Sequence, residues 1–275
     1  MNKILFAATF IGTLLFLGCS EYQKKKEPKK EWKFIKELQL QDISPIGIVA
    51  QNNFLWLSDV DNNRVVKINI EGKMIEEYSG FERPMHIALN NGALYIPEYT
   101  SDTIQILKNG NTSAFKLKDQ PDSIGGIAFD SSTIAVADFN NHRIILQQGE
   151  SAVTFGKEGH GEGELYYPTD VAFFAGKIYV ADAYNNRIQV FDKQGNSLQI
   201  IGDKDGINVA TGLEVANNQL FVTDFEGNRV LVYDLEGNLL QTLSKNLHKP
   251  TDIAIMENIM YAVNYEGQSV AVYQF

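Results

Sequence analysis

The stretch YVADAYNNRIQVF, residues 179–191, decides the fold because variants of it recur through the chain. An alternation of apolar residues ends in Asp182, a short turn ends in Asn186, and a second alternation begins at Arg187. Five further variants begin at residues 56, 95, 135, 221 and 261. The residue that ends the first alternation is acidic in five repeats and an amide in the last: Asp59, Glu98, Asp138, Asp182, Asp224 and Asn264. These positions are 39 to 44 residues apart, so the chain is a tandem repeat with a period near 40.

The spacing of apolar residues within each repeat has a period of two, which is typical of strands rather than helices. In the fourth repeat we expect strands at 170–174, 177–182, 187–192 and 197–201. The first of these is a nearly continuous apolar run, as expected for an innermost strand that is buried on both faces. Six repeats of four strands predict an all-β fold, a six-bladed β-propeller of four-stranded antiparallel blades.

The turn within each repeat has a residue pattern with a structural explanation. Asp182 can accept hydrogen bonds from backbone amides of the turn that follows it, and Asn186 tolerates a left-handed backbone conformation. We therefore expect the repeated acid, Asn and Arg to act mainly on structure.

The two ends of the repeat region predict how the ring closes. The sixth repeat stops at residues 269–275, its third strand, and therefore lacks an outer strand. The segment WKFIKELQL, residues 32–40, precedes the first complete blade and resembles an outer strand. We expect it to complete the last blade, which removes an open sheet edge.

The N-terminal residues have a different character from the repeats. Residues 1–18 hold Lys3 and then an apolar run that is too short to span a bilayer, as in a secretory signal peptide. The run ends in Phe16-Leu17-Gly18-Cys19, which resembles a bacterial lipobox and makes Cys19 the expected site of lipid attachment. The alternative is an ordinary signal peptide followed by a coincidental cysteine. Residues 19–31 are a charged tether, so we expect an exported, lipid-anchored protein of the bacterial cell envelope, facing the periplasm or the exterior.

The repeat pattern resembles the NHL repeat family. The resemblance rests on Pro168-Thr169-Asp170-Val171-Ala172, on the apolar-Ala-Asp of the second strand, and on Asn-x-Arg-Val/Ile after the turn. The Gly-rich stretch at 155–165 is similar to that family's connector, and the resemblance covers about residues 43–275. It implies a monomeric six-bladed propeller, of bacterial lipoprotein type here, that serves as an interaction platform.

The charge of the chain limits its partners. The formal net charge is −10, and residues 32–275 alone carry −13. Nucleic-acid binding requires clustered Lys and Arg, so an acidic body argues against it. We expect a protein, peptide or glycan ligand instead.

Three residues near the predicted central funnel form a candidate metal site. The residues at the start of the innermost strands are Gly47, His86, Gly126, Asp170, Gly212 and Asp252. The polar ones fall in blades two, four and six, which lie about 120° apart in a sixfold ring. One His and two carboxylates could bind Zn or Mn, or Ca through oxygen. The alternative is three independent residues that bond to loop backbone.

The amidating lyases that resemble NHL propellers place metal-binding histidines in this region, and only His86 matches them. The resemblance therefore implies at most a partial likeness to that metal site.

A second candidate site is the face on which the turns gather. The five repeat acids, with Asp170 and Asp252, predict an acidic face that attracts cations or basic peptides. Aromatic residues follow the acids and could stack on sugars or anchor a peptide, or could pack within their own hairpins. These ligand-binding candidates are Tyr99, Phe139, Tyr184, Phe225 and Tyr265.

Two function classes follow from these features. No nucleophile–base arrangement or nucleotide-binding motif is present in the sequence, so no catalytic residue is assigned. A non-catalytic binding scaffold that uses its top face is the first interpretation. The alternative is a metal-dependent lyase or hydrolase with its site in the central funnel, which rests on analogy at the level of the fold.

Overall fold

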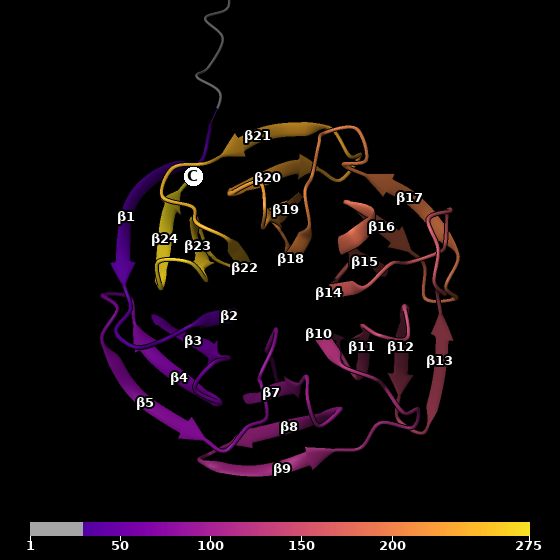
Figure 1. The fold of residues 1–275 in the computed structure, drawn as a ribbon, viewed down its shortest axis with the longest axis horizontal. Helices are drawn as coiled ribbons and strands as arrows, with labels where there is room; N and C mark the ends of the chain where they lie inside the picture. Colours follow the sequence, from indigo (N-terminus) through magenta and orange to yellow (C-terminus); the bar gives the residue numbers. More distant parts are fainter. Residues whose placement is uncertain (1–29) are drawn as a thin grey trace, which may run out of the picture. The chain divides into compact units, whose positions relative to one another are not determined.

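The computed structural model describes residues 30–275, and Glu31–Phe275 form one unit. The predicted signal peptide, Cys19 and most of the tether lie outside the described residues. Within the described unit, six four-stranded antiparallel sheets are arranged radially around a central axis (Figure 1). The predicted six-bladed all-β propeller is confirmed.

The strands follow the repeat in chain order. Blade one holds β2 (Pro45–Gln51), β3 (Phe54–Asp59), β4 (Arg64–Asn69) and β5 (Met74–Ser79). Blade two holds β6 (Ala88–Asn90), β7 (Ala93–Glu98), β8 (Thr103–Lys108) and β9 (Asn111–Phe115). Blade three holds β10 (Ile124–Asp130), β11 (Thr133–Asp138), β12 (Arg143–Gln148) and β13 (Ser151–Phe155).

The second half of the ring repeats this order. Blade four holds β14 (Pro168–Phe174), β15 (Lys177–Asp182), β16 (Arg187–Phe191) and β17 (Ser197–Ile201), with the 3-10 turn η1 (Ala183–Asn185). Blade five holds β18 (Ala210–Ala216), β19 (Gln219–Asp224), β20 (Arg229–Asp234) and β21 (Leu239–Leu243). Blade six holds β22 (Pro250–Met256), β23 (Ile259–Asn264), β24 (Ser269–Gln274) and β1 (Lys33–Gln39).

The last blade is completed by the N-terminal strand, as the sequence predicts. Strand β1 pairs antiparallel with β24, from Lys33 opposite Gln274 to Gln39 opposite Ser269. Trp32, just before β1, is only 2% exposed and packs edge-to-face on Phe221 of blade five, with ring centroids 5.3 Å apart. The first described residues therefore contact two blades that lie about two hundred residues away in sequence.

The hydrophobic core is divided among the interfaces between blades. Each of six apolar clusters joins side chains of two neighbouring blades, so every sheet is buried on both faces near the axis. In blade four, for example, Val180 packs toward blade three and Tyr179 toward blade five. Successive strand residues point to opposite faces, which explains why the second and third strands of each repeat are apolar almost throughout.

The innermost strands approach one another closely around the axis. The His86 amide donates to the Gly125 carbonyl at 3.2 Å, and His86 forms a parallel bridge with Gly126. In blade two the innermost strand β6 has only three residues; before it, Pro84 bridges Glu98 of the same blade, whereas His86 bridges Gly126 of blade three. Within residues 30–275, no helix is long and apolar enough to cross a membrane.

Candidate functional site

The acids that end the second strand of blades one to five are buried, and their carboxylates are hydrogen-bonded. Four of them accept a hydrogen bond from the Nε of the arginine five residues later, at 2.7–2.8 Å. These pairs are Asp59–Arg64, Asp138–Arg143, Asp182–Arg187 and Asp224–Arg229, and each aspartate side chain is fully buried. In blade two the longer Glu98 accepts hydroxyl hydrogen bonds from Ser101 and Thr103 instead.

The expectation that these five acids form an exposed acidic face is therefore wrong. Each carboxylate also accepts a backbone N–H from the loop that enters its own blade, as Asp182 does from Tyr166 at 2.7 Å. The acids hold that loop against the turn, so their role is structural, as the turn chemistry predicts.

The residue before each arginine ties one blade to the next. Asn186 has the predicted left-handed backbone, with a φ of 56°, and its side chain accepts a hydrogen bond from the Val209 amide of the following loop. His142 occupies the same position in blade three, with a φ of 52°, and its Nδ1 accepts from the Tyr167 amide at 3.0 Å. The equivalent contacts from blades one and five are those of Asn63 and Asn228, and in blade two Asp102, which precedes Thr103, makes it.

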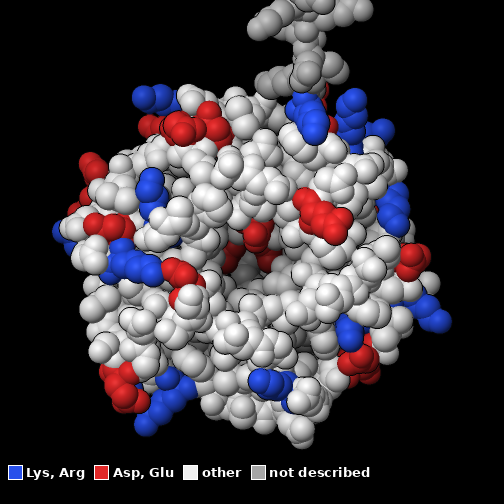
Figure 2. Space-filling view, turned by 180° about the vertical axis from the view of Figure 1, so that it is seen from behind, with Lys and Arg blue, Asp and Glu red and all other residues white. Residues whose placement is uncertain are grey.

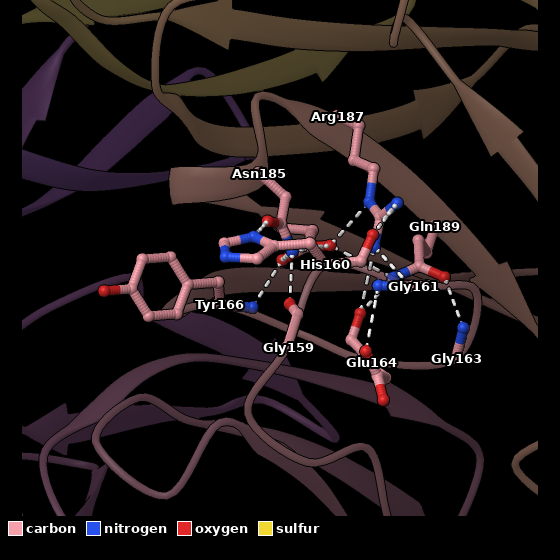
Figure 3. A network of polar contacts seen from close by, with 10 residues as sticks. Gly159, His160, Gly161, Gly163, Glu164, Tyr166, Asn185, Arg187 and Gln189 are labelled. Atoms are coloured by element: carbon pink, nitrogen blue, oxygen red, sulfur yellow. Dashed lines mark hydrogen bonds and ion pairs between the residues drawn. The ribbon is translucent and has the colours of Figure 1, made fainter.

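The Gly-rich connector at 155–165 folds around Arg187 (Figure 3). The guanidinium donates to the carbonyls of His160, at 3.0 Å, and of Glu164, at 3.1 Å. Gln189 donates to the Glu164 carbonyl and accepts from the Gly163 amide. The connector therefore has a defined conformation that rests on buried polar side chains of blade four.

The structure brings His86, Asp170 and Asp252 together at the start of the innermost strands. One potential ligand atom from each residue lies within 4.8 Å of the others. The His86 Nδ1 is 3.4 Å from a carboxylate oxygen of Asp252 and 3.9 Å from one of Asp170. All three residues are buried, so the cluster lies within the protein and not on an exposed rim.

The intervening glycines explain why three polar side chains fit at the axis. A β-carbon on Gly47 would lie 2.8 Å from the His86 Cα, and one on Gly212 would lie 2.8 Å from the Asp252 Cα. A β-carbon on Gly126 would likewise lie 3.0 Å from the Asp170 Cα. Only alternate blades can therefore place a side chain here, and the alternation of glycine with His or Asp follows from this crowding.

A third acid lines the channel and was missed by the sequence reasoning. Glu214 lines the central cavity of about 330 Å³ together with His86, Asp170 and Asp252. Figure 2 shows acidic side chains inside this hollow. Glu214 lies two residues after Gly212, and the corresponding residues of blades two, three, four and six are alanines. The sequence signal that could have revealed Glu214 is its charge at a repeat position that is alanine in four other blades.

Burial and mutual charge shift the titration of this cluster. Burial lowers the pKa of His86, but the nearby charges of Asp170 and Asp252 outweigh it and raise the pKa to about 9. Burial raises the pKa of Asp170 to about 7, against the opposing effect of His86. Burial, with the charges of Asp252 and Asp170, raises the pKa of Glu214 to about 8. The channel therefore brings three carboxyl groups and one imidazole together where water solvates charge poorly.

Three of the five predicted aromatic residues form one continuous group, which we call the aromatic arc. Its members are Tyr99, Phe139, Tyr166, Tyr167 and Tyr184, from blades two and three, the loop that enters blade four, and blade four itself. Tyr99 and Phe139 are 5.9 Å apart, Phe139 and Tyr167 are 4.8 Å apart, and Tyr167 and Tyr184 are 5.2 Å apart between ring centroids.

The other two predicted aromatics lie outside the arc and make polar or cationic contacts. The ammonium of Lys249 lies 4.9 Å from the ring centroid of Phe225, and the Tyr265 hydroxyl donates to Asp61 at 3.3 Å. The arc contacts run between blades, so its aromatics do not pack only within their own hairpins. The sequence reasoning missed Tyr166 and Tyr167, because they lie in the loop that enters blade four and not in the repeated turn.

Comparison with protein families agrees with the repeat pattern. Residues 165–191 match the NHL repeat. The chain is also 53% identical over 45 residues to Protein lin-41 of Caenorhabditis elegans, a match that spans 16% of this chain and 4% of that protein. NHL propellers commonly mediate protein interactions.

Solved structures confirm the propeller. A streptogramin B lyase has a TM-score of 0.66 and 16% identity, over 89% of this chain and 87% of that one. Virginiamycin B lyase from Staphylococcus aureus has a TM-score of 0.65 and 16% identity, over 89% of this chain and 100% of that one. At this level of identity the likeness shows the fold alone.

Proposed function

We propose that this NHL-type propeller is a non-catalytic binding scaffold that holds a basic segment of a partner protein on its aromatic arc. The observation that carries the proposal is the continuity of the arc across blades two to four, with the Tyr184 side chain 55% exposed. Large aromatic side chains dominate the binding energy of protein interfaces, and a tyrosine combines an apolar face with a hydroxyl for hydrogen bonding.

The support beneath the arc makes it a rigid surface. Tyr184 lies two residues after Asp182. The Asp182 carboxylate accepts hydrogen bonds from Arg187 and from the Tyr166 amide. Tyr167 is held by the hydrogen bond from its amide to His142. Because these turns are already ordered, little conformational entropy is lost when a partner binds.

Charge favours a basic partner. Residues 32–275 carry a net charge of −13, which attracts positively charged segments over several ångströms at physiological ionic strength. A basic segment can add stacking of arginine on tyrosine, as Arg83 already does with Tyr99 at 5.6 Å from the ring centroid.

The lipid anchor at Cys19 is part of the same proposal. Lipidation at Cys19 and the tether that follows would hold the propeller at a membrane of the cell envelope while leaving the arc accessible. Expression with a labelled fatty acid tests it. We expect label in the wild-type protein and none in Cys19→Ser, with the variant lost from the membrane fraction. Equal labelling of both proteins would contradict the anchor.

The binding test uses residues 30–275 and two panels of probes: pools of basic peptides and an array of oligosaccharides. We expect binding to a peptide pool, weakened at least tenfold by Tyr184→Ala. Tyr265→Ala is the matched control, because Tyr265 is 36% exposed in an equivalent turn but lies outside the arc. Binding to oligosaccharides alone, or equal losses in the two variants, would overturn the proposed protein ligand.

A second candidate function is a metal-dependent lyase or hydrolase with its site in the central channel. The observation that favours it is the buried cluster of His86, Asp170 and Asp252, with Glu214 in the same cavity. Assays of lyase and hydrolase substrates, with a streptogramin B antibiotic among them, test it. Turnover that is lost in Asp252→Asn would favour the enzyme, and no turnover of any substrate by metal-supplemented protein would count against it.

A further inference from the structure

The aspartates of the channel differ from the other buried aspartates in their partners. Asp59, Asp138, Asp182 and Asp224 each have an arginine at hydrogen-bond distance. Within the described part of the chain, His86 is the only basic residue paired with Asp170 and Asp252. Among the residues that line the channel, all within 30–275, there is no Lys or Arg. Buried carboxylates require a compensating charge, and here the protein supplies less of it than there are acids.

The nitrogen of His86 that faces the two carboxylates is also unsatisfied. Within the described residues, the His86 Nδ1 is buried and has no hydrogen-bond partner. It lies 3.4 Å from the nearer carboxylate, in a geometry that does not form a hydrogen bond. A buried polar atom without a partner is costly and calls for an explanation. A cation between the three residues would satisfy the nitrogen and both carboxylates together.

We propose that His86, Asp170 and Asp252 bind one divalent transition-metal ion where the innermost strands begin. The ligand atoms are the His86 Nδ1 and one carboxylate oxygen from each aspartate, all within 4.8 Å of one another. An imidazole nitrogen favours Zn²⁺ or Mn²⁺ over Ca²⁺ or Mg²⁺, which prefer six or more oxygen ligands. Three protein ligands leave a coordination position open toward the cavity.

The surrounding backbone orients both carboxylates. Asp252 accepts the Ile48 amide at 2.9 Å, and Asp170 accepts the Leu213 amide at 3.0 Å. These contacts join blade six to blade one and blade four to blade five, so the carboxylates are fixed before any ion arrives. Glu214 adds a further carboxyl group to the same cavity.

The experiment uses purified residues 30–275, stripped with a chelator and dialysed. Zn²⁺ is titrated against a chromophoric chelator, and Co²⁺ is added separately so that its visible absorption reports the coordination. We expect one ion per chain in the wild type. We expect at least tenfold weaker binding and loss of the Co²⁺ spectrum in His86→Ala. Asp252→Asn keeps the side-chain volume and should weaken binding similarly. It provides a second test of the site if His86→Ala does not fold.

His142→Asn is the matched control, since His142 is another buried histidine and lies outside the cluster. It should bind Zn²⁺ as the wild type does. The proposal is overturned if the folded wild type binds no Zn²⁺, or if His86→Ala and Asp252→Asn both retain a full equivalent of bound ion. Ca²⁺ binding without Zn²⁺ binding would overturn the assignment of the metal class. The result is independent of the aromatic arc, so Tyr184→Ala should retain the ion.

Discussion

Gly126 and Asp170 are in direct contact across neighbouring blades: a β-carbon on Gly126 would overlap the Asp170 carboxylate and lie 3.0 Å from its Cα. We therefore expect Gly126→Ala to destabilise the protein by about 1–3 kcal/mol through overpacking. Denaturant unfolding measures this cost. Gly161→Ala is the control, because the β-carbon would meet only the flexible Glu164 side chain. Equal costs for the two variants would show that crowding at the axis is not the cause.

The buried pair of Asp182 and Arg187 should be far more sensitive to mutation than an exposed ion pair. Removing the guanidinium in Arg187→Ser leaves a fully buried carboxylate without its charge partner, at a cost of about 3–5 kcal/mol. Lys193→Ala, which removes the more exposed pair with Asp130, should cost less than about 1 kcal/mol.

Blade six suggests a rescue for the Arg187 variant. There the equivalent positions are Asn264 and Ser269, and the amide donates to the hydroxyl at 3.0 Å. Adding Asp182→Asn to Arg187→Ser should therefore recover part of the lost free energy of unfolding. A double variant that is less stable than Arg187→Ser alone would contradict this explanation.

Removal of the closing strand should weaken the whole ring. A chain that begins at residue 41 lacks β1 and Trp32, whose indole donates to Gln219 and packs on Phe221. Loss of a buried tryptophan alone costs about 3–5 kcal/mol, so we expect the melting temperature to fall by roughly 10 °C or more. A chain that begins at residue 30 serves as the control. If both chains melt at the same temperature, β1 does not close the ring.

His142 should be replaceable by the residue that its neighbours use. His142→Asn keeps an acceptor for the Tyr167 amide and a residue type that tolerates the left-handed backbone, so its stability should stay within about 0.5 kcal/mol of the wild type. His142→Ala loses the acceptor and is strained at this φ, at a cost of about 1–3 kcal/mol. Thermal and denaturant unfolding of the pair test this. Equal stabilities would argue that the contact between blades contributes nothing.

The repeat in the sequence determined the architecture of this protein. The number of its copies predicts the number of blades, and the alternation of apolar residues within each copy predicts the strands. The missing fourth strand of the last repeat predicts the pairing of β1 with β24. The positions of His86, Asp170 and Asp252 within their repeats were also enough to predict that they meet at the axis. Each of these follows because equivalent positions in a closed ring are related by a fixed rotation.

Only the tertiary structure decided which polar groups are free to bind a ligand. An acid recurs at the position of Asp182 in five repeats, which suggested an acidic binding face. Arg187 pairs with Asp182 instead, and the aspartate side chain is fully buried. Glu214 is not repeated, and it enters the channel because it follows Gly212 on an innermost strand. Tyr167 joins the aromatic arc from the loop that enters blade four, outside the repeated turn. The period of the sequence determines where each backbone segment lies in the ring. The accessibility and charge compensation of a polar side chain depend on its contacts with side chains and loops that are distant in the sequence.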